Sequence, residues 1–318
     1  MQRVAIIIPY FGKWPVWMDF YLYTCSRQQN VDFLFFTDCG IPKTVYKNTI
    51  FREINYSTYC KKISDKLGID FNNDVPPYKL CDCRPFFGII HKEELSKYEF
   101  WGFADIDLIY GNLNYMLNNE NLKKYDFISS HSERIAGHLT VIRNIKKYNN
   151  ACFYIPNWKE KLLEKKLCAL DESIQFGMII NPCYKFIAST YYHIFKHIYQ
   201  RNKYRYFDLV QRITQPFHKR SLFKERYTTP IPQIGQKWKY NLKTGEIIVP
   251  HDAWYKMPPD GGKIYLHFLF FKKTIYRKTD LYWKDDFYKI PENFNFDKET
   301  GTIIISTDGI YLETQKCL

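Results

Sequence analysis

The sequence lacks any hydrophobic run long enough to cross a membrane. No stretch approaches the roughly eighteen consecutive apolar residues that a spanning helix needs. The opening segment, Met1 to Pro9, is too short an apolar run for a secretory signal peptide and is typical of a first β-strand. We therefore expect a cytoplasmic protein, either fully soluble or peripheral to the inner face of the plasma membrane.

Several motifs of cofactor chemistry are also missing. No Gly-x-Gly-x-x-Gly follows the first expected strand, and no Gly-x-x-x-x-Gly-Lys-Ser/Thr occurs, so dinucleotide and P-loop sites lose support. The nine cysteines include no Cys-x-x-Cys, and Cys81-x-Cys83 fits neither a zinc nor a thioredoxin pattern. Reduced thiols are the simplest explanation. No internal repeat or low-complexity stretch is evident.

Acidic residues are scarce relative to basic ones. The chain of 318 residues has 33 Asp and Glu against 46 Lys and Arg, which gives a net charge of +13. Such an excess indicates attraction to an anionic partner, and a nucleotide, a phospholipid surface and nucleic acid all fit. The aromatic content of 19% supplies ample material for a core.

The first part of the chain alternates between apolar strands and helical patterns. Alternation of this kind predicts an α/β fold with a mostly parallel sheet flanked by helices. Ligands bind such sheets at the carboxyl ends of the strands. The expected strands are 4–8, 31–36 and 49–54, and the expected helices are 14–27 and 57–67, the second with Ser57 as its N-cap and Gly68 as its end.

The most informative stretch is Phe100 to Asn112, in which a buried strand ends in two acids. Because alternate side chains of an extended segment share a face, Asp105 and Asp107 point the same way. Two neighbouring carboxylates repel unless a positive charge lies between them, and a divalent cation is suited to that place. An oxygen site at a strand end fits Mg²⁺ or Mn²⁺ held partly by substrate phosphates. A pair of loop carboxylates without any ion is the alternative.

Other charged residues have two interpretations from sequence alone. Lys79, Asp82 and Arg84 can share a helical face, either as a surface ion-pair cluster or as a site for nucleotide phosphates. Asp171 and Glu172 open an expected helix, where acids are favoured by the helix dipole alone.

Taken together, these parts resemble a nucleotide-sugar-dependent glycosyltransferase of the GT-A fold, in particular uncharacterised transferases of bacterial surface-polysaccharide clusters. The resemblance runs from about Val4 to Lys273 and rests on 6–11, 36–38, 79–84 and 103–107. It implies that Asp107 ligates Mn²⁺ or Mg²⁺ and that Asp105 contacts ribose or metal. It also implies donor-binding roles for Pro9, Tyr10, Phe11, Thr37, Asp38, Lys79, Asp82 and Arg84.

The carboxyl-terminal half is similar to glycogenin-like and lipopolysaccharide galactosyltransferase-like enzymes. That similarity implies that His267 is a third metal ligand and that Lys272 or Lys273 touches the diphosphate, although the family's intervening glycine is missing. Gly137 and His138 resemble the strand facing the donor sugar, with Ile135 in place of its Asn. Asp171 and Glu172 resemble the helix start that faces this sugar, and they are the candidate catalytic carboxylates.

We expect a catalytic domain over 1–275, including a basic helical annex at about 190–227, and a small β extension over 276–318. Bases interleaved with aromatics in 191–227 favour either an anionic-membrane face or an ordinary solvated annex.

The predicted function is therefore a metal-dependent transferase that moves a sugar from a nucleotide donor, UDP-sugar most readily, to a glycan or lipid-linked glycan. Nucleic acid is not an expected partner. The alternatives are a metal-dependent nucleotidyltransferase or phosphodiesterase, and a non-enzymatic polyanion-binding protein.

Overall fold

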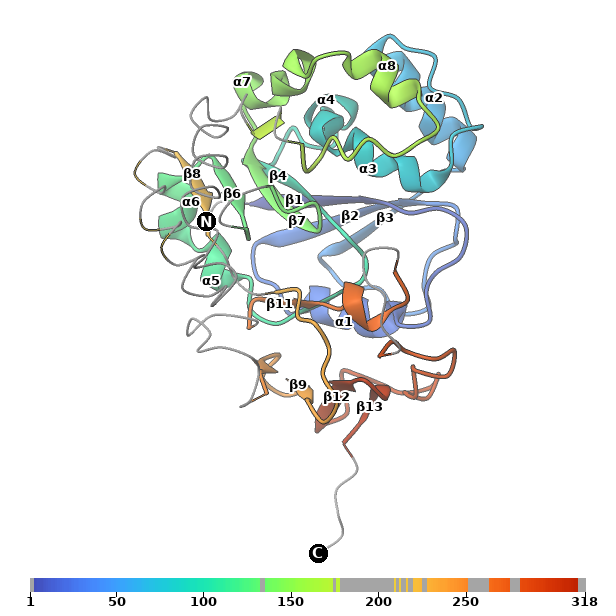
Figure 1. Cartoon of the computed structure of the whole chain (residues 1–318), viewed down its shortest axis with the longest axis vertical. Coiled ribbons are helices and arrows are strands. Elements are labelled where there is room, and N and C mark those ends of the chain that lie inside the picture. The colour runs from blue at the N-terminus through green and yellow to red at the C-terminus, as the bar shows by residue number, and fades with distance from the viewer. Residues whose placement is uncertain are drawn as a thin grey trace, which may run out of the picture. The chain divides into compact units, whose positions relative to one another are not determined.

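The computed structural model describes residues 3–131, 135–173, 176–177, 209, 212, 216, 220–224, 228–250, 263–274 and 281–313 (Figure 1). The chain forms two compact units, each built from separate segments. Unit 1 comprises Met1–Trp14, Asn30–Asp105 and Asn119–Glu225, and unit 2 comprises Pro15–Gln29, Ile106–Asn118 and Arg226–Leu318. The sequence-based division at residue 275 stays a prediction.

Unit 1 is mixed α/β, with a large, mostly parallel sheet flanked by helices, as expected. Seven strands lie in the order β3-β2-β1-β4-β7-β6-β8. The pairs β1–β2, β2–β3, β1–β4 and β6–β8 are parallel. The strands are β1 (Val4–Pro9), β2 (Val31–Thr37), β3 (Thr49–Glu53), β4 (Phe100–Ala104), β6 (Phe127–Ser129), β7 (Leu139–Arg143) and β8 (Ser221–Phe223).

The strand predictions at the start of the chain are confirmed. β1 and β2 are buried along almost their whole length, which explains their continuous runs of apolar residues. One strand departs from the parallel pattern, since β7 runs antiparallel to both β4 and β6. β8 lies at the end of the stretch expected to be a helical annex and is a strand instead, because it pairs with β6 at the sheet edge.

Helices cover one face of this sheet, as Figure 1 shows for α2, α3, α4, α7 and α8. The main core fills this layer and includes fully buried Tyr59, Phe86 and Trp101. The helices are α2 (Tyr56–Leu67), η1 (Pro77–Lys79), α3 (Leu80–Cys83), η2 (Arg84–Phe86), α4 (Phe87–Ile90), α6 (Asn119–Lys124), α7 (Lys146–Asn149), η3 (Ala151–Tyr154) and α8 (Trp158–Leu163).

The start of α2 differs from the prediction. Asn55, not Ser57, is its N-cap, because the Asn55 side chain accepts a hydrogen bond from the backbone N–H of Thr58. The helix ends as predicted at Gly68, which has the left-handed conformation (φ +63°) that glycine adopts without strain.

Unit 2 contains two small antiparallel sheets. One has the order β10-β9-β12-β13, and the other pairs β5 with β11. The predicted hairpin within 238–249 is confirmed as β9 and β10, and the strands near the end of the chain pair with β9 through β12. The elements are α1 (Met18–Ser26), β5 (Leu108–Tyr110), α5 (Asn114–Leu117), β9 (Trp238–Asn241), β10 (Ile247–Ile248), β11 (Tyr265–His267), η5 (Leu269–Phe271), β12 (Thr302–Ser306) and β13 (Gly309–Leu312).

Two sequence predictions need comment. The sequence from Asn112 to Lys124 predicts a single helix, whereas the structure has two, α5 and α6, because Asn118 between them has an extended backbone. The basic annex at about 190–227 lies mostly outside the described residues, apart from 209, 212, 216 and 220–224.

Gly102 lies where β4 approaches β7 most closely, and it provides a test of this sheet. A Cβ at this position would lie 2.4 Å from the backbone oxygen of Thr140. We expect Gly102→Ala to lower the free energy of unfolding by about 2–4 kcal/mol, since the clash is with backbone and the strands must separate. Urea denaturation measures this loss.

Gly68→Ala is the matched control for that substitution. It meets no atom within 4 Å, although its φ is +63°, so its cost should be about 1 kcal/mol. Equal losses for the two variants would contradict the packing of β4 against β7.

Candidate functional site

The loops that follow three neighbouring strands of unit 1 form one rim, as predicted. β2, β1 and β4 are adjacent and parallel, so their carboxyl ends lie at the same edge of the sheet. This edge carries Pro9 to Phe11 after β1, Thr37 and Asp38 after β2, and Asp105 directly after β4.

The first two of these loops are joined by a hydrogen bond. The backbone N–H of Gly12 donates to Oδ1 of exposed Asp38 at 2.7 Å. The ring of Tyr10 stacks on that of Trp14, with centroids 5.3 Å apart. Of the predicted donor-binding residues, partly exposed Pro9 and Tyr10 and exposed Asp38 therefore reach solvent here.

Two further predicted residues of these loops, Phe11 and Thr37, are buried. Phe11 is buried in the core against Tyr56 and Tyr59. Thr37 is fully buried, and its hydroxyl accepts a hydrogen bond from the N–H of Cys39. The structure gives no support to a ligand contact through either side chain.

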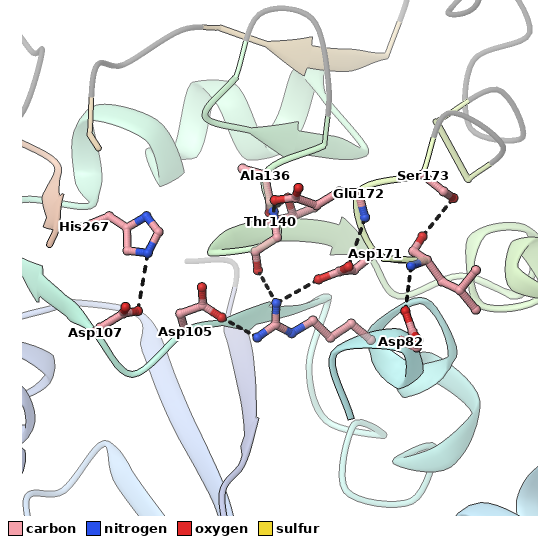
Figure 2. Close-up of polar contacts among 12 residues, drawn as sticks. Asp82, Asp105, Asp107, Ala136, Thr140, Asp171, Glu172, Ser173 and His267 are labelled. Atoms are coloured by element: carbon pink, nitrogen blue, oxygen red, sulfur yellow. Dashed lines mark hydrogen bonds and ion pairs between the residues drawn. The ribbon is translucent and has the colours of Figure 1, made fainter. Parts of the chain in front are cut away.

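Arg84 pairs with two acidic residues of unit 1, Asp105 and Asp171, which Figure 2 labels. Its guanidinium forms ion pairs with Asp105 and with Oδ2 of Asp171, the latter at 2.8 Å. It also donates to the carbonyl oxygen of Gly137 at 2.9 Å. Since Arg84 follows α3, Asp105 follows β4 and Asp171 lies in a turn, one cation fixes three separate segments.

Asp171 and Glu172 are held beside the turn before β7. A Cβ on Gly137 would lie 2.9 Å from an oxygen of each, so a larger residue there would displace these two carboxylates. Its N–H donates to Oε1 of Glu172 at 3.1 Å. Burial raises the pKa of Asp171 to about 6, and Arg84 opposes this rise only in part.

His138, the neighbour of Gly137, turns its side chain away from this cluster. Its imidazole is 4% exposed, lies edge-on to His131 and approaches the Ser130 hydroxyl at 3.4 Å. Its carbonyl oxygen accepts the N–H of Asp105 at 3.1 Å. His138 therefore contributes through its backbone, and a donor contact by its side chain has no support.

Lys79 and Asp82 are buried, and their side chains contact other groups of the same protein. The two form an ion pair of 2.8 Å with side chains that are 0% exposed. The Lys79 ammonium donates to the carbonyls of Lys161 and Lys166, at 2.6 Å each. The Asp82 carboxylate accepts the N–H groups of 168 and 170, at 2.8 Å each.

This buried pair is thus a structural clamp on the loop that leads directly into Asp171. Only Cys83 separates Asp82 from Arg84, so the same short segment holds both the loop and the Asp171 carboxylate. Donor binding by Lys79 or Asp82 gains no support from this arrangement.

In unit 2, the Asp107 carboxylate faces the imidazole of His267 and the ammonium of Lys272. Strand β11 pairs antiparallel with β5, which sets His267 opposite Leu108, and the N–H of Phe268 continues the ladder to the Asp107 carbonyl at 3.2 Å. Nε2 of His267 consequently lies 3.4 Å from Oδ1 of Asp107 (Figure 2).

Lys272 reaches the other oxygen of the same carboxylate. The strand expected over 263–273 stops at His267, and the 3₁₀ turn η5 bends the chain back. The Lys272 ammonium thereby lies 2.6 Å from Oδ2 of Asp107. Lys273 is exposed. The sequence leaves Lys272 and Lys273 as alternatives for the contact with the diphosphate. The position of Lys272 beside Asp107 favours Lys272.

Burial alone would raise the pKa of Asp107, but the charges of His267 and Lys272 outweigh it and hold the pKa well below its usual range. Asp107 is therefore ionised at neutral pH. The chain ties Asp105 to this pair, since only Ile106 intervenes. Asp105, Asp107 and His267 each offer one ligand atom, and these atoms all lie within 4.8 Å of one another.

This set of side chains fits a divalent cation. Two carboxylates and an imidazole are accepted by several divalent metals, and three protein ligands leave positions for water or substrate oxygens. The predicted metal triad thus exists in the structure as a possible site.

Sequence reasoning missed two residues that support this triad. Nε1 of Trp17 donates to the carbonyl of Ile106 at 3.0 Å, and the Lys272 ammonium lies over its ring, 5.5 Å from the centroid. The Thr229 hydroxyl lies 3.0 Å from Nδ1 of His267 and so orients the imidazole. Neither position follows from local sequence, because both contacts join segments far apart in the chain.

Residues 6–298 match a protein family described as "Family of unknown function (DUF6625)". No curated protein matches the chain. The part matched includes every residue of the rim, the Arg84 cluster and the triad.

The Lys79–Asp82 clamp can be tested through stability. Asp82→Asn leaves a buried ammonium without its counter-charge and removes an acceptor for a loop N–H. We expect a loss of about 3–5 kcal/mol in the free energy of unfolding, measured by urea denaturation. Asp74→Asn, at an exposed position, should change it by less than about 0.5 kcal/mol, and similar values for both would contradict the clamp.

Proposed function

The chain belongs to the DUF6625 family, and we propose that it is a metal-dependent glycosyltransferase of GT-A-like fold. It moves a sugar from a nucleoside diphosphate, with a UDP-sugar as the favoured donor, to a glycan or a lipid-linked glycan. The observation that carries the proposal is the group Asp105, Asp107 and His267, of which the two carboxylates follow a central strand of a mostly parallel sheet. Such strand ends are where α/β sheets bind nucleotides.

The donor set supports Mn²⁺ or Mg²⁺ as the metal. Both accept carboxylates and keep open positions for phosphate oxygens, and Mn²⁺ also accepts imidazole readily. When bound, the cation would neutralise charge on the leaving diphosphate. Asp105, Asp107 and His267 would hold it.

The neighbouring side chains support the handling of an anionic leaving group. The Lys272 ammonium pairs with Asp107, and the Lys272 side chain is 32% exposed. A divalent cation bound to Asp107 would leave this ammonium free to contact a diphosphate oxygen. As the bond between the sugar C1 and the phosphate oxygen breaks, the electron pair stays on the diphosphate, where a fixed cation lowers the barrier.

Tyr10 and Asp38 would bind the nucleoside. The exposed carboxylate of Asp38 can accept from ribose hydroxyls, and the Tyr10–Trp14 stack offers an aromatic surface for a base.

Asp171 is the candidate base of an inverting transfer. In that route the acceptor hydroxyl gives its proton to the Asp171 carboxylate while its oxygen bonds to C1. A retaining transfer needs no such base, because a phosphate oxygen of the leaving group can take the proton. The effect of Asp171 on rate therefore distinguishes the two routes.

The metal site is tested first by Asp107→Asn. We expect a UDP-sugar with Mn²⁺ to raise the melting temperature of the wild type, and EDTA to abolish the shift. Asp107→Asn should lose the shift, and His267→Ala should weaken metal affinity by about 10–100-fold. Exposed Asp308→Asn should behave as wild type.

The products then decide between enzyme classes. Release of nucleoside diphosphate would support the transferase, whereas pyrophosphate or nucleoside monophosphate would support a nucleotidyltransferase or phosphodiesterase. A donor shift that survives EDTA and Asp107→Asn would overturn the proposal.

The pH dependence tests Asp171 in its proposed role. Because its pKa is raised to about 6, the inverting activity should fall as the pH drops below about 6 and level off above it. Asp171→Asn should abolish this activity. An unchanged profile in Asp171→Asn would exclude Asp171 as the base.

The same pKa has a consequence for stability. The folded protein keeps a proton on Asp171 between about pH 4 and about pH 6 that the unfolded chain has lost. The contribution of Asp171 to the free energy of unfolding therefore declines as the pH rises through this window, and Asp171→Asn should remove that slope.

A further inference from the structure

One segment of unit 1 exposes several large hydrophobic side chains within a short stretch of sequence. Among the described residues, twelve large hydrophobic side chains are exposed, and four of them lie within 145–166. Tyr154 is 75% exposed and Leu163 is 42% exposed. The four are Ile145, Phe153, Tyr154 and Leu163.

The same segment is rich in lysine and contains no arginine. Residues 145–166 hold six lysines and two glutamates. Four of the lysines, at 146, 147, 165 and 166, are exposed together with Lys159. The Lys159 ammonium lies over the ring of Trp158, 5.5 Å from its centroid. We call residues 145–166 the aromatic–lysine surface.

This surface is firmly backed by the core of unit 1. Leu162 is fully buried, and the ring of Trp158 packs against Phe86 at 5.2 Å. The buried Lys79 ammonium binds the carbonyls of Lys161 and Lys166. α7 and α8, which lie within the segment, belong to the helical layer over the sheet (Figure 1). Its exposed side chains therefore project from a fixed backbone.

We infer that the aromatic–lysine surface binds the headgroup region of an anionic lipid bilayer. Aromatic rings favour the interface between headgroups and acyl chains, and lysines extend past them to lipid phosphates. Juxtaposed hydrophobic and basic side chains are the pattern of interfacial binding. The inference is independent of the proposed transferase activity.

The composition favours a bilayer over a protein partner. Protein interfaces are enriched in arginine and depleted of lysine, whereas this segment has six lysines and no arginine. A lysine ammonium needs no planar partner, so it suits a fluid layer of phosphates better than a fixed carboxylate.

The surface also differs from the one suggested by sequence alone. There, the candidate was the basic stretch 191–227, most of which lies outside the described residues. The exposure and packing of residues 145–166, by contrast, are observed in the structure. The test must therefore separate lipid binding at 145–166 from lipid binding at 191–227.

The test is sedimentation with vesicles of phosphatidylglycerol and phosphatidylcholine, against vesicles of phosphatidylcholine alone. Wild type should bind the anionic vesicles, less so at high salt. Lys165→Gln/Lys166→Gln should lower the partition coefficient by roughly 25-fold, about 5-fold for each lysine. Tyr154→Ser/Leu163→Ser should lower it at least several-fold.

Matched controls use exposed residues elsewhere. Lys43→Gln/Lys47→Gln removes two exposed lysines, and Ile234→Ser removes a side chain that is 79% exposed. We expect both to bind as wild type. Thermal unfolding should be unchanged in all variants, because none of these side chains is buried.

Several outcomes would overturn the inference. Wild type that binds neither vesicle excludes a lipid surface altogether. Surface variants that bind as well as wild type would place lipid binding elsewhere, including the stretch 191–227. Equal loss in the lysine control would show a general effect of net charge.

Discussion

The structure around the site depends on one electrostatic constraint, which is the repulsion between two carboxylates two residues apart. Asp105 and Asp107 follow the same buried strand, and each is neutralised by a different part of the chain. Arg84 pairs with Asp105 in unit 1. Lys272 and His267 face Asp107 in unit 2. Removal of Arg84 or of Lys272 would leave a poorly solvated carboxylate without its counter-charge, and this is costly.

Much of the fold could be predicted because local pattern determines it. The strands at 4–9 and 31–37 are continuous apolar runs, and such runs belong to buried parallel strands. Because ligands bind α/β sheets at the carboxyl ends of the strands, the sequence also predicts which loops surround the site. The strand-end rule and the paired carboxylates predict Asp105 and Asp107 as ligands, whereas His267 is predicted only through the family resemblance.

Several wrong predictions involve contacts between distant segments. Lys79 and Asp82 have the spacing of a surface ion pair, and their burial depends on carbonyls and N–H groups more than eighty residues away. The antiparallel direction of β7 depends on its partners, not on its own sequence. The N-cap of α2 is a local case. Ser57 and Asn55 are both favourable N-cap residues, and only the backbone geometry selects Asn55.

The charge balance near the site differs from that of the whole chain. The net charge is +13, yet in unit 1 Arg84 pairs with two acids, Asp105 and Asp171, and in unit 2 Lys272 pairs with Asp107. The site therefore carries more acidic than basic groups, and a free diphosphate would be repelled there. A divalent cation reverses that balance where the carboxylates converge, whereas the lysines of 145–166 supply positive charge at a separate surface. Two anionic partners, each with its own means of attraction, are consistent with this distribution.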